Sequence, residues 1–251
     1  MQTAEYDRMF ALEDRYWWFV GRRRLALRLL KRALGVAPHP PTPSSPGPVV
    51  LDLGCGTGVI ASELAHWSHP VGLDMSSQAL AYCRQRGVAD LVLANGEALP
   101  IRSASVDAVL ALDIFEHIQD DRAAFAEAFR VLRPGGVLVL SVPAFRWLWG
   151  PHDVALMHHR RYTRPEVRAR LSEAGFGIRR LSYNVFFLFP VVVLVRALEK
   201  LRRGPAKASL PRVPEWLNAA LIDLQDIEAR WIESVALPWG SSVIAVAKKP
   251  E

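Results

Sequence analysis

Several features common in other protein classes are missing from this chain of 251 residues. It has only two cysteines, too few for a disulfide framework, which favours a reducing compartment. The first residues are polar and acidic, so we expect no secretory signal there. The longest apolar run, residues 186–195, has about half the length that spans a bilayer and contains Pro190. These absences predict a cytoplasmic protein, soluble or peripherally attached to a membrane.

Two phosphate-binding signatures are also missing, although the stretch VVLDLGCGTGVIASEL at 49–64 holds closely spaced glycines. A Walker loop requires Gly-Lys followed by Ser or Thr, and no such triplet follows. The dinucleotide fingerprint requires a third glycine where this chain has Val59. Asp52, two residues before Gly54, would repel a pyrophosphate. The loop therefore predicts a ligand with an amino group and no phosphate, such as S-adenosylmethionine.

The chain divides into three parts by composition. Residues 1–35 have apolar side chains at helical spacing, and they predict a helical cap or lid with a possible break at Gly21. Residues 36–48 are rich in proline and predict an extended linker. Residues 49–251 predict one domain, with a helical insertion at about 186–240.

Apolar strand-like segments alternate with helical segments from residue 48 onward. This alternation predicts an α/β fold with a mostly parallel sheet and helices on both faces. Thr163 and Glu166 have the spacing of a capping box at the start of one helix. Ligands of such sheets bind at the carboxyl ends of the strands, where the strand order reverses.

Five segments together resemble a known family over about residues 48–143. They occur in the expected order and spacing: LDLGCGTG, GLDMS, NGEALPI, SVDAVLALDIFEHI and FRVLRPGGVLVLSVP. The family is that of the class I S-adenosylmethionine-dependent methyltransferases, methyltransferase-11 type. The resemblance implies a Rossmann-like, doubly wound sheet of seven strands, mostly parallel, whose last strand is antiparallel. It implies that residues 49–251 are the methyltransferase domain.

The resemblance also implies which residues bind S-adenosylmethionine. The residues expected at its methionine part are Asp52, Gly54, Cys55 and Gly56. Asp74 is expected to accept hydrogen bonds from the ribose hydroxyls, and Asp113 to face the sulfonium. The residues expected around the adenine are Met75, Asn95, Gly96 and Glu97. Family members usually have Asp where this chain has Asn95, which accepts a hydrogen bond without charge.

The N-terminal run YWWFVGRRR, residues 16–24, offers further cofactor contacts. Its aromatic side chains cannot all face one side of a helix, so packing in the core or at an interface is the simpler interpretation. As a functional alternative, Trp18 would cover the sulfonium through a cation–aromatic contact. Arg22 or Arg23 would pair with the cofactor carboxylate.

Histidines dominate the region where the methyl acceptor is expected. A hydroxyl acceptor must lose its proton, and a histidine or carboxylate suits that task. The candidate catalytic residues are His117, His152 and Tyr162; His158 and His159 lie in the same window, and each single histidine could instead have a surface or capping role. No metal site is predicted. Asp113, Glu116 and His117 form a less favoured metal-binding alternative, because Glu116 and His117 more often begin the next helix.

The predicted function is methyl transfer to a small-molecule or lipid-linked acceptor, most simply to oxygen. The helical insertion begins with apolar residues and continues with basic ones. It is expected to be a buried helix that closes the acceptor pocket; the alternative is a membrane-surface contact in which Arg202 and Arg203 meet acidic headgroups. The net charge of +6 leaves methylation of nucleic acid as an alternative function, because nucleic-acid-binding proteins are commonly basic. The absence of a [DNS]-P-P-[YFW] motif and of a Pro-Cys pair argues against nucleic acid as partner. A non-catalytic cofactor-binding protein is the remaining alternative, and the oligomeric state is not predicted.

Overall fold

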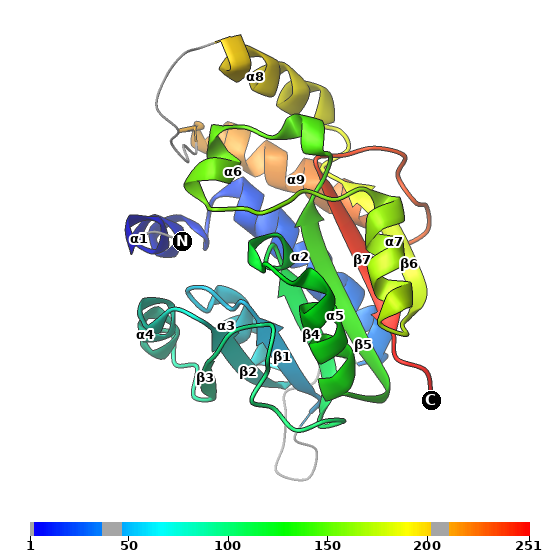
Figure 1. Ribbon diagram of the computed structural model, residues 1–251. Coiled ribbons are helices and arrows are strands. Elements are labelled where there is room, and N and C mark those ends of the chain that lie inside the picture. Colours follow the sequence, from blue (N-terminus) through cyan, green and yellow to red (C-terminus); the bar gives the residue numbers. More distant parts are fainter. Residues whose placement is uncertain (1–2, 37–46, 202–210) are drawn as a thin grey trace.

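The computed structural model describes residues 3–36, 47–201 and 211–251. Its centre is a seven-stranded sheet with the strand order β3-β2-β1-β4-β5-β7-β6 (Figure 1). Strand β7 is antiparallel to both of its neighbours, and the other six strands share one direction. The strands are β1 Val49–Leu53, β2 His69–Asp74, β3 Leu91–Leu93, β4 Val106–Leu112, β5 Leu132–Pro143, β6 Gly177–Asn184 and β7 Ser242–Lys248. The Rossmann-like fold expected from the sequence is thereby confirmed.

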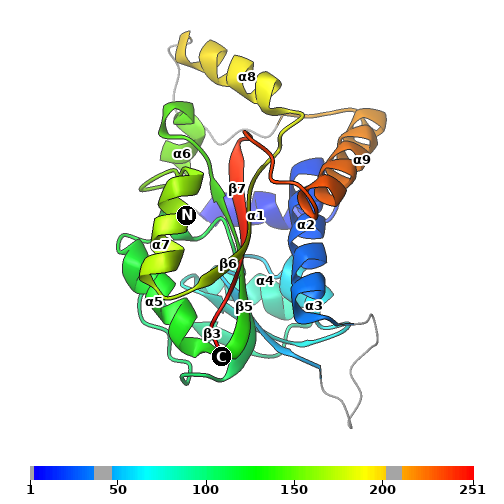
Figure 2. The same ribbon diagram turned by 90° about the vertical axis from the view of Figure 1, so that its right-hand side faces the viewer.

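Helices cover both faces of the sheet (Figures 1 and 2). One buried cluster lies under α2, α3 and α9, and the other lies under α5 and α7. Each of these five helices contributes one apolar face to these clusters, and that burial is the main source of the fold's stability. The helices are α1 Thr3–Leu12, α2 Trp17–Leu34, α3 Val59–Leu64, α4 Ser77–Gln85, α5 Asp121–Val131, α6 Pro151–Ala155, α7 Arg164–Glu173, α8 Phe189–Leu201 and α9 Glu215–Ile232, with short 3-10 turns η1 Phe115–His117 and η2 Arg146–Leu148.

The N-terminal helices differ from the expectation in one respect. The break between α1 and α2 lies at residues 13–16, and Gly21 lies inside α2. A Cβ atom on Gly21 would lie only 2.3 Å from Oε1 of Gln225 in α9. This glycine therefore permits the close packing of two helices and does not interrupt one.

Other local expectations can be compared directly with the structure. Glu166 accepts hydrogen bonds from the backbone N–H and the hydroxyl of Thr163, at 2.7 and 2.8 Å, so the capping box of α7 is confirmed. The insertion contains the two helices α8 and α9. Most of the predicted linker, residues 37–46, lies outside the described residues, as do Arg202 and Arg203. Within the described segments, no helix has both the length and the apolar character needed to cross a bilayer.

The carboxyl ends of β1, β2, β4 and β5 meet at one edge of the sheet because these strands are parallel. Helix α1 lies beside α4 at this edge (Figure 1). Asp7 of α1 accepts hydrogen bonds from Gln78 and Tyr82 of α4, and Phe10 stacks on Tyr82 with ring centroids 4.4 Å apart. The edge and the helix over it define where a ligand of this fold binds.

Candidate functional site

The glycine loop connects β1 to α3 at this edge. The backbone N–H groups of Gly54 and Cys55 donate to the carbonyl of Leu73 in β2, at 2.8 and 2.9 Å. Gly54 and Gly56 have φ angles of 74° and 55°, in the left-handed region that favours glycine. A Cβ atom on Gly54 would lie 2.7 Å from the side chain of Ile114. The loop thus needs glycine both for its conformation and for the close approach of its neighbours.

Asp74, the predicted ribose ligand, organises the same loop. Its carboxylate accepts hydrogen bonds from the backbone N–H groups of Gly56, at 3.0 Å, and Ser76, at 2.8 Å. Tyr6 of α1 also hydrogen-bonds this carboxylate. Burial is the largest effect on both side chains: it raises the pKa of Asp74 and, with the nearby Asp74 charge, raises the pKa of Tyr6 to about 12. Asp74 therefore links β2, the glycine loop, α4 and α1.

The residues expected around the adenine lie next to Asp74. The backbone N–H of Ala94 donates to the Asp74 carbonyl at 3.1 Å, which places the turn after β3 beside the end of β2. Met75 is 74% exposed, so its side chain is free to cover a ring. Asn95 accepts from the backbone N–H of Glu97 at 3.2 Å, which fixes the turn. Gly96 in this turn is buried.

An arginine from the N-terminal region reaches the end of β4. Arg22 of α2 forms an ion pair with Asp113, and the hydroxyl of Ser141 donates to the same carboxylate at 3.3 Å. Asp113 has a φ of 52°, unusual for a residue that is not glycine. Arg22 was expected to bind the cofactor carboxylate; its Nε, buried, has no hydrogen-bond partner within the described chain. That nitrogen is a buried donor that a ligand would satisfy.

Asp52 lies at the centre of the cofactor side and is 2% exposed. Burial raises its pKa to about 7, and the charges of Asp74 and Glu13 add to this effect. Its Oδ2 atom has no hydrogen-bond partner among the residues that the structure describes. A buried carboxylate oxygen without a partner is costly, and a cationic ligand would remove that cost.

These observations test whether the residues suit S-adenosylmethionine. The methionine part of that cofactor is a zwitterion with one ammonium and one carboxylate group. The buried Oδ2 of Asp52 and Nε of Arg22 have the charges that complement these two groups. The glycines allow the backbone to approach the ligand, and Asp74 and Asn95 offer oxygen acceptors farther along the edge. The residues present fit the cofactor.

Helix α1 and the residues that follow it cover the glycine loop. Met9 of α1 lies over Gly56, where an added Cβ atom would be 2.7 Å from the methionine methyl group. The hydroxyl of Thr57, in the loop, donates to the buried carboxylate of Glu13. Arg86 of α4 forms an ion pair with the same glutamate at 2.9 Å. These contacts hold the N-terminal segment against the loop.

Trp18 lies in a different environment from these residues. Its ring packs edge-on against Trp17, with ring centroids 5.7 Å apart. The backbone N–H of Trp17 donates to Asn218 of α9 at 2.9 Å, so this pair is near the α2–α9 contact. That Trp18 covers the sulfonium stays a prediction.

A second group of polar side chains gathers around η1, after β4. Glu116 is completely buried, and apart from its own backbone N–H its carboxylate has no hydrogen-bond donor in the described segments. Burial raises the pKa of Glu116 to about 8 and lowers the pKa of His117 to about 3. The ring of His158 lies edge-on against that of His117, with centroids 4.6 Å apart. His152 is next to His158, at 6.4 Å between centroids, and burial lowers its pKa to about 4.

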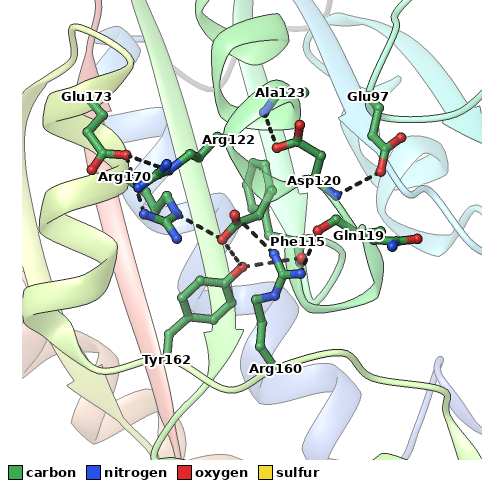
Figure 3. Close-up of polar contacts among 11 residues, drawn as sticks. Glu97, Phe115, Gln119, Asp120, Arg122, Ala123, Arg160, Tyr162, Arg170 and Glu173 are labelled. Atoms are coloured by element: carbon green, nitrogen blue, oxygen red, sulfur yellow. Dashed lines mark hydrogen bonds and ion pairs between the residues drawn. The ribbon is translucent and has the colours of Figure 1, made fainter.

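Backbone and side-chain bonds hold the segment 158–162 against η1 (Figure 3). The backbone N–H of His159 donates to the Glu116 carbonyl at 2.7 Å, and Arg160 donates to the Gln119 carbonyl at 2.6 Å. The Tyr162 hydroxyl, labelled in Figure 3, donates to a carboxylate oxygen of Asp121. The distance between the two oxygens is 3.0 Å. This network brings His117 and His158 next to each other, although they are 41 residues apart in the sequence.

Tyr162 was a candidate catalytic residue, and its environment favours a structural role. It is 3% exposed, and burial, followed by the charge of Asp121, raises its pKa far above the ordinary value. Its hydroxyl is engaged by the Asp121 carboxylate and the Phe115 carbonyl. His117 and His152 remain the candidates for acceptor-side chemistry from the sequence.

Asp153 is a residue whose importance the sequence did not reveal. It is completely buried and forms two hydrogen bonds with Arg161, at 2.7 and 3.0 Å. Its Oδ1 atom also accepts from Nδ1 of His158 at 2.9 Å. Burial alone would raise its pKa, but these bonds hold the pKa of Asp153 well below its usual value. The adjacency of His152 and Asp153 was visible in the sequence, but the bonded histidine is His158.

Comparisons with known proteins agree with this geometry. The family model "Methyltransferase domain" matches residues 51–140. An uncharacterized methyltransferase of Mycobacteroides abscessus is 30% identical over 68% of this chain and 68% of its own length. A probable S-adenosylmethionine-dependent methyltransferase of Mycolicibacterium smegmatis is 37% identical over 51% of this chain and 52% of its own length. The chain spans about half the length of the first two curated relatives that it matches.

Two further similarities concern substrates and fold. The malonyl-[acyl-carrier protein] O-methyltransferase of Yersinia pestis is 38% identical over 39% of this chain and 38% of its own length. Among solved structures, a phosphoethanolamine N-methyltransferase of Haemonchus contortus in complex with S-adenosyl-L-methionine has a TM-score of 0.58. It is 18% identical and covers 90% of this chain and 52% of its own, so it supports the fold alone.

Proposed function

Because the chain belongs to the S-adenosylmethionine-dependent methyltransferases and its cofactor is S-adenosylmethionine, we propose that it methylates an oxygen of a small-molecule or lipid-linked acceptor. The cofactor supplies a methyl group already activated on a sulfonium. The protein must therefore align the acceptor, exclude water and remove a proton. In this proposal, Asp52 and Arg22 hold the methionine part, Asp74 holds the ribose, and the N-terminal helices act as a lid.

One observation carries the choice of oxygen: a histidine oriented by a buried carboxylate lies beside η1. A hydroxyl acceptor needs a nearby base during transfer. The ionised Asp153 accepts from Nδ1 of His158, so Nε2 of His158 keeps the lone pair that can take a proton. His117, neutral at physiological pH, lies against the same ring. This arrangement suits an acceptor that loses a proton.

Exposed apolar side chains near the acceptor side support an acceptor with an apolar part. Helix α8 lies above α6 in both views (Figures 1 and 2). Four of its exposed side chains have the spacing of one helix face, here named the α8 apolar face: Val191, Leu194, Val195 and Leu198. Val154 and Met157, in and just after α6, are also exposed. A lipid-linked acceptor, or a membrane surface that carries it, would cover this apolar area.

The similarity to malonyl-[acyl-carrier protein] O-methyltransferases also favours oxygen as the acceptor atom. Those relatives match only part of this chain, so the similarity supports the type of reaction more than the acceptor. A carrier-bound or lipid-linked carboxylate or hydroxyl is the class of acceptor that agrees both with the α8 apolar face and with the similarity to O-methyltransferases.

The proposal is tested by incubating the protein with methyl-labelled S-adenosylmethionine and fractionated extract from the source organism. We expect label in the lipid or small-molecule fraction, in a product whose mass spectrum places the methyl group on oxygen. The double variant Leu194→Ser and Leu198→Ser should raise the KM for that acceptor and leave the affinity for S-adenosylhomocysteine unchanged. Label in RNA or DNA, or on nitrogen, would contradict the proposal.

A further inference from the structure

Glu116 is a buried carboxyl group without a direct ionic partner. Two arginines face it, but each already pairs with another carboxylate, Arg22 with Asp113 and Arg161 with Asp153. Neither oxygen of Glu116 accepts a hydrogen bond from another described residue. Burying a polar group without a hydrogen-bond partner costs free energy in either protonation state, so native proteins seldom do so without a role for the group.

Two histidines complete a constellation around Glu116. One donor atom from each of Glu116, His117 and His158 lies within 4.8 Å of the others. We infer that these three side chains bind a divalent transition-metal ion, with zinc as the best match. This site differs from the alternative considered from the sequence, because Asp113 is engaged by Arg22 and His158 takes its place.

The second nitrogen of each ring is held by an oxygen acceptor, as is usual for histidines that bind metals. Nδ1 of His158 donates to Asp153 at 2.9 Å, and His117 hydrogen-bonds the backbone carbonyl of Leu156. Such bonds fix the tautomer and the ring orientation and leave the other nitrogen free for the ion. Asp153 is itself fixed by Arg161 and by the backbone N–H of Gly150, at 2.9 Å. The orientation of the ligands is therefore built in advance of metal binding.

The donor set indicates the class of metal. Two imidazoles and one carboxylate are typical of zinc and similar ions, whereas magnesium and calcium prefer oxygen donors. Three protein ligands leave a coordination position open for a further ligand. When the ion is bound, Nε2 of His158 is a ligand and does not act as the base of the proposed O-methylation. The acceptor oxygen would then bind the ion, which would lower its pKa, and its proton would pass to water. Metal binding itself does not depend on that reaction.

The test uses the full chain without an affinity tag, freed of metal with a chelator and saturated with S-adenosylhomocysteine. Zinc is titrated in competition with a chromophoric chelator, and cobalt is titrated while its visible absorption bands are recorded. We expect one ion per chain and cobalt bands typical of mixed nitrogen and oxygen ligands. His158→Ala should weaken zinc binding at least about 100-fold. His159→Ala is the matched control, because this neighbouring side chain is exposed, it is not one of the three proposed ligands, and the backbone N–H that donates to Glu116 is kept.

Calorimetry with S-adenosylhomocysteine separates loss of metal binding from loss of fold or of cofactor binding. Both variants should bind this ligand as the wild type does. Equal zinc affinity in the His158 and His159 variants would overturn the inference, and so would zinc binding far below one ion per chain in the wild type. Methyl transfer to oxygen without bound metal would overturn only the link to the reaction, whereas metal binding with transfer to nitrogen would contradict only the proposed function.

Discussion

The cofactor side and the acceptor side of the sheet edge are held together in different ways. At Asp74 on the cofactor side, a carboxylate binds backbone N–H groups, those of Gly56 and Ser76. On the acceptor side, polar and charged side chains bind one another, as Tyr162 does with Asp121. The first arrangement depends on the path of the backbone, and the second depends on a set of mutually paired side chains. Substitutions should therefore have different consequences on the two sides.

The largest expected effect is on stability and falls on the acceptor side. Asp153→Asn would leave the buried Arg161 without its ionic partner, and it would replace one of two accepting carboxylate oxygens by an NH2 group that cannot accept a hydrogen bond. We expect a loss of about 3–5 kcal/mol in the free energy of unfolding, measured by denaturant titration. The control is Asp226→Asn, which breaks the partly exposed ion pair with Arg24 and should cost less than about 1 kcal/mol. Equal losses in the two variants would contradict the comparison.

The second effect concerns the pH dependence of cofactor affinity. Because burial raises the pKa of Asp52 to about 7, this carboxylate, which we propose to bind the cofactor ammonium, is protonated at lower pH. Binding should favour the ionised form and release a proton, so affinity should rise as pH rises through about 7. Between about pH 6 and pH 7.5 we expect nearly a tenfold gain, about 1.4 kcal/mol. Calorimetry of S-adenosylhomocysteine binding measures it, and Asp52→Asn should remove this dependence.

A smaller effect distinguishes structure from chemistry at Tyr162. Tyr162→Phe removes the hydroxyl that donates to Asp121, but Arg160 and Arg170 still pair with that carboxylate. We expect the free energy of unfolding to fall by about 1 kcal/mol, with unchanged affinity for S-adenosylhomocysteine. A stable variant that loses nearly all methyl transfer would show instead that Tyr162 is catalytic.

The smallest effect is expected at the adenine end of the cofactor side. Asn95 accepts through an amide oxygen where relatives of this type usually carry Asp. Asn95→Asp adds a charge to the acceptor and should strengthen S-adenosylhomocysteine binding about two- to tenfold, since hydrogen bonds to charged groups are stronger. Calorimetry at a fixed pH measures the change. Weaker binding would mean that the turn serves another purpose or that nearby Glu97 repels the new charge.

The same difference explains what the sequence could and could not predict. The glycine loop, Asp74 and Asn95 were recognisable because each lies in a short contiguous motif of the family that the chain resembles. The mostly parallel sheet followed from the alternation of elements, and the antiparallel last strand followed from the family resemblance; the strand order itself was not predicted. Asp153 was not recognised, because its partners His158 and Arg161, five and eight residues later, form no contiguous motif with it. The break at residues 13–16 was misplaced because Gly21 serves helix packing.

The proposed cofactor site depends most on Asp74, and one calorimetric experiment tests the role of this residue directly. S-adenosylhomocysteine is titrated into the wild type, Asp74→Ala and Asp90→Ala, whose exposed side chain contacts His69. We predict one ligand per wild-type chain, equal affinity in Asp90→Ala, and binding at least about 100-fold weaker in Asp74→Ala, because charged hydrogen bonds contribute about 1.5–3 kcal/mol each. Failure of the wild type to bind, or equal affinity in all three proteins, would contradict the account.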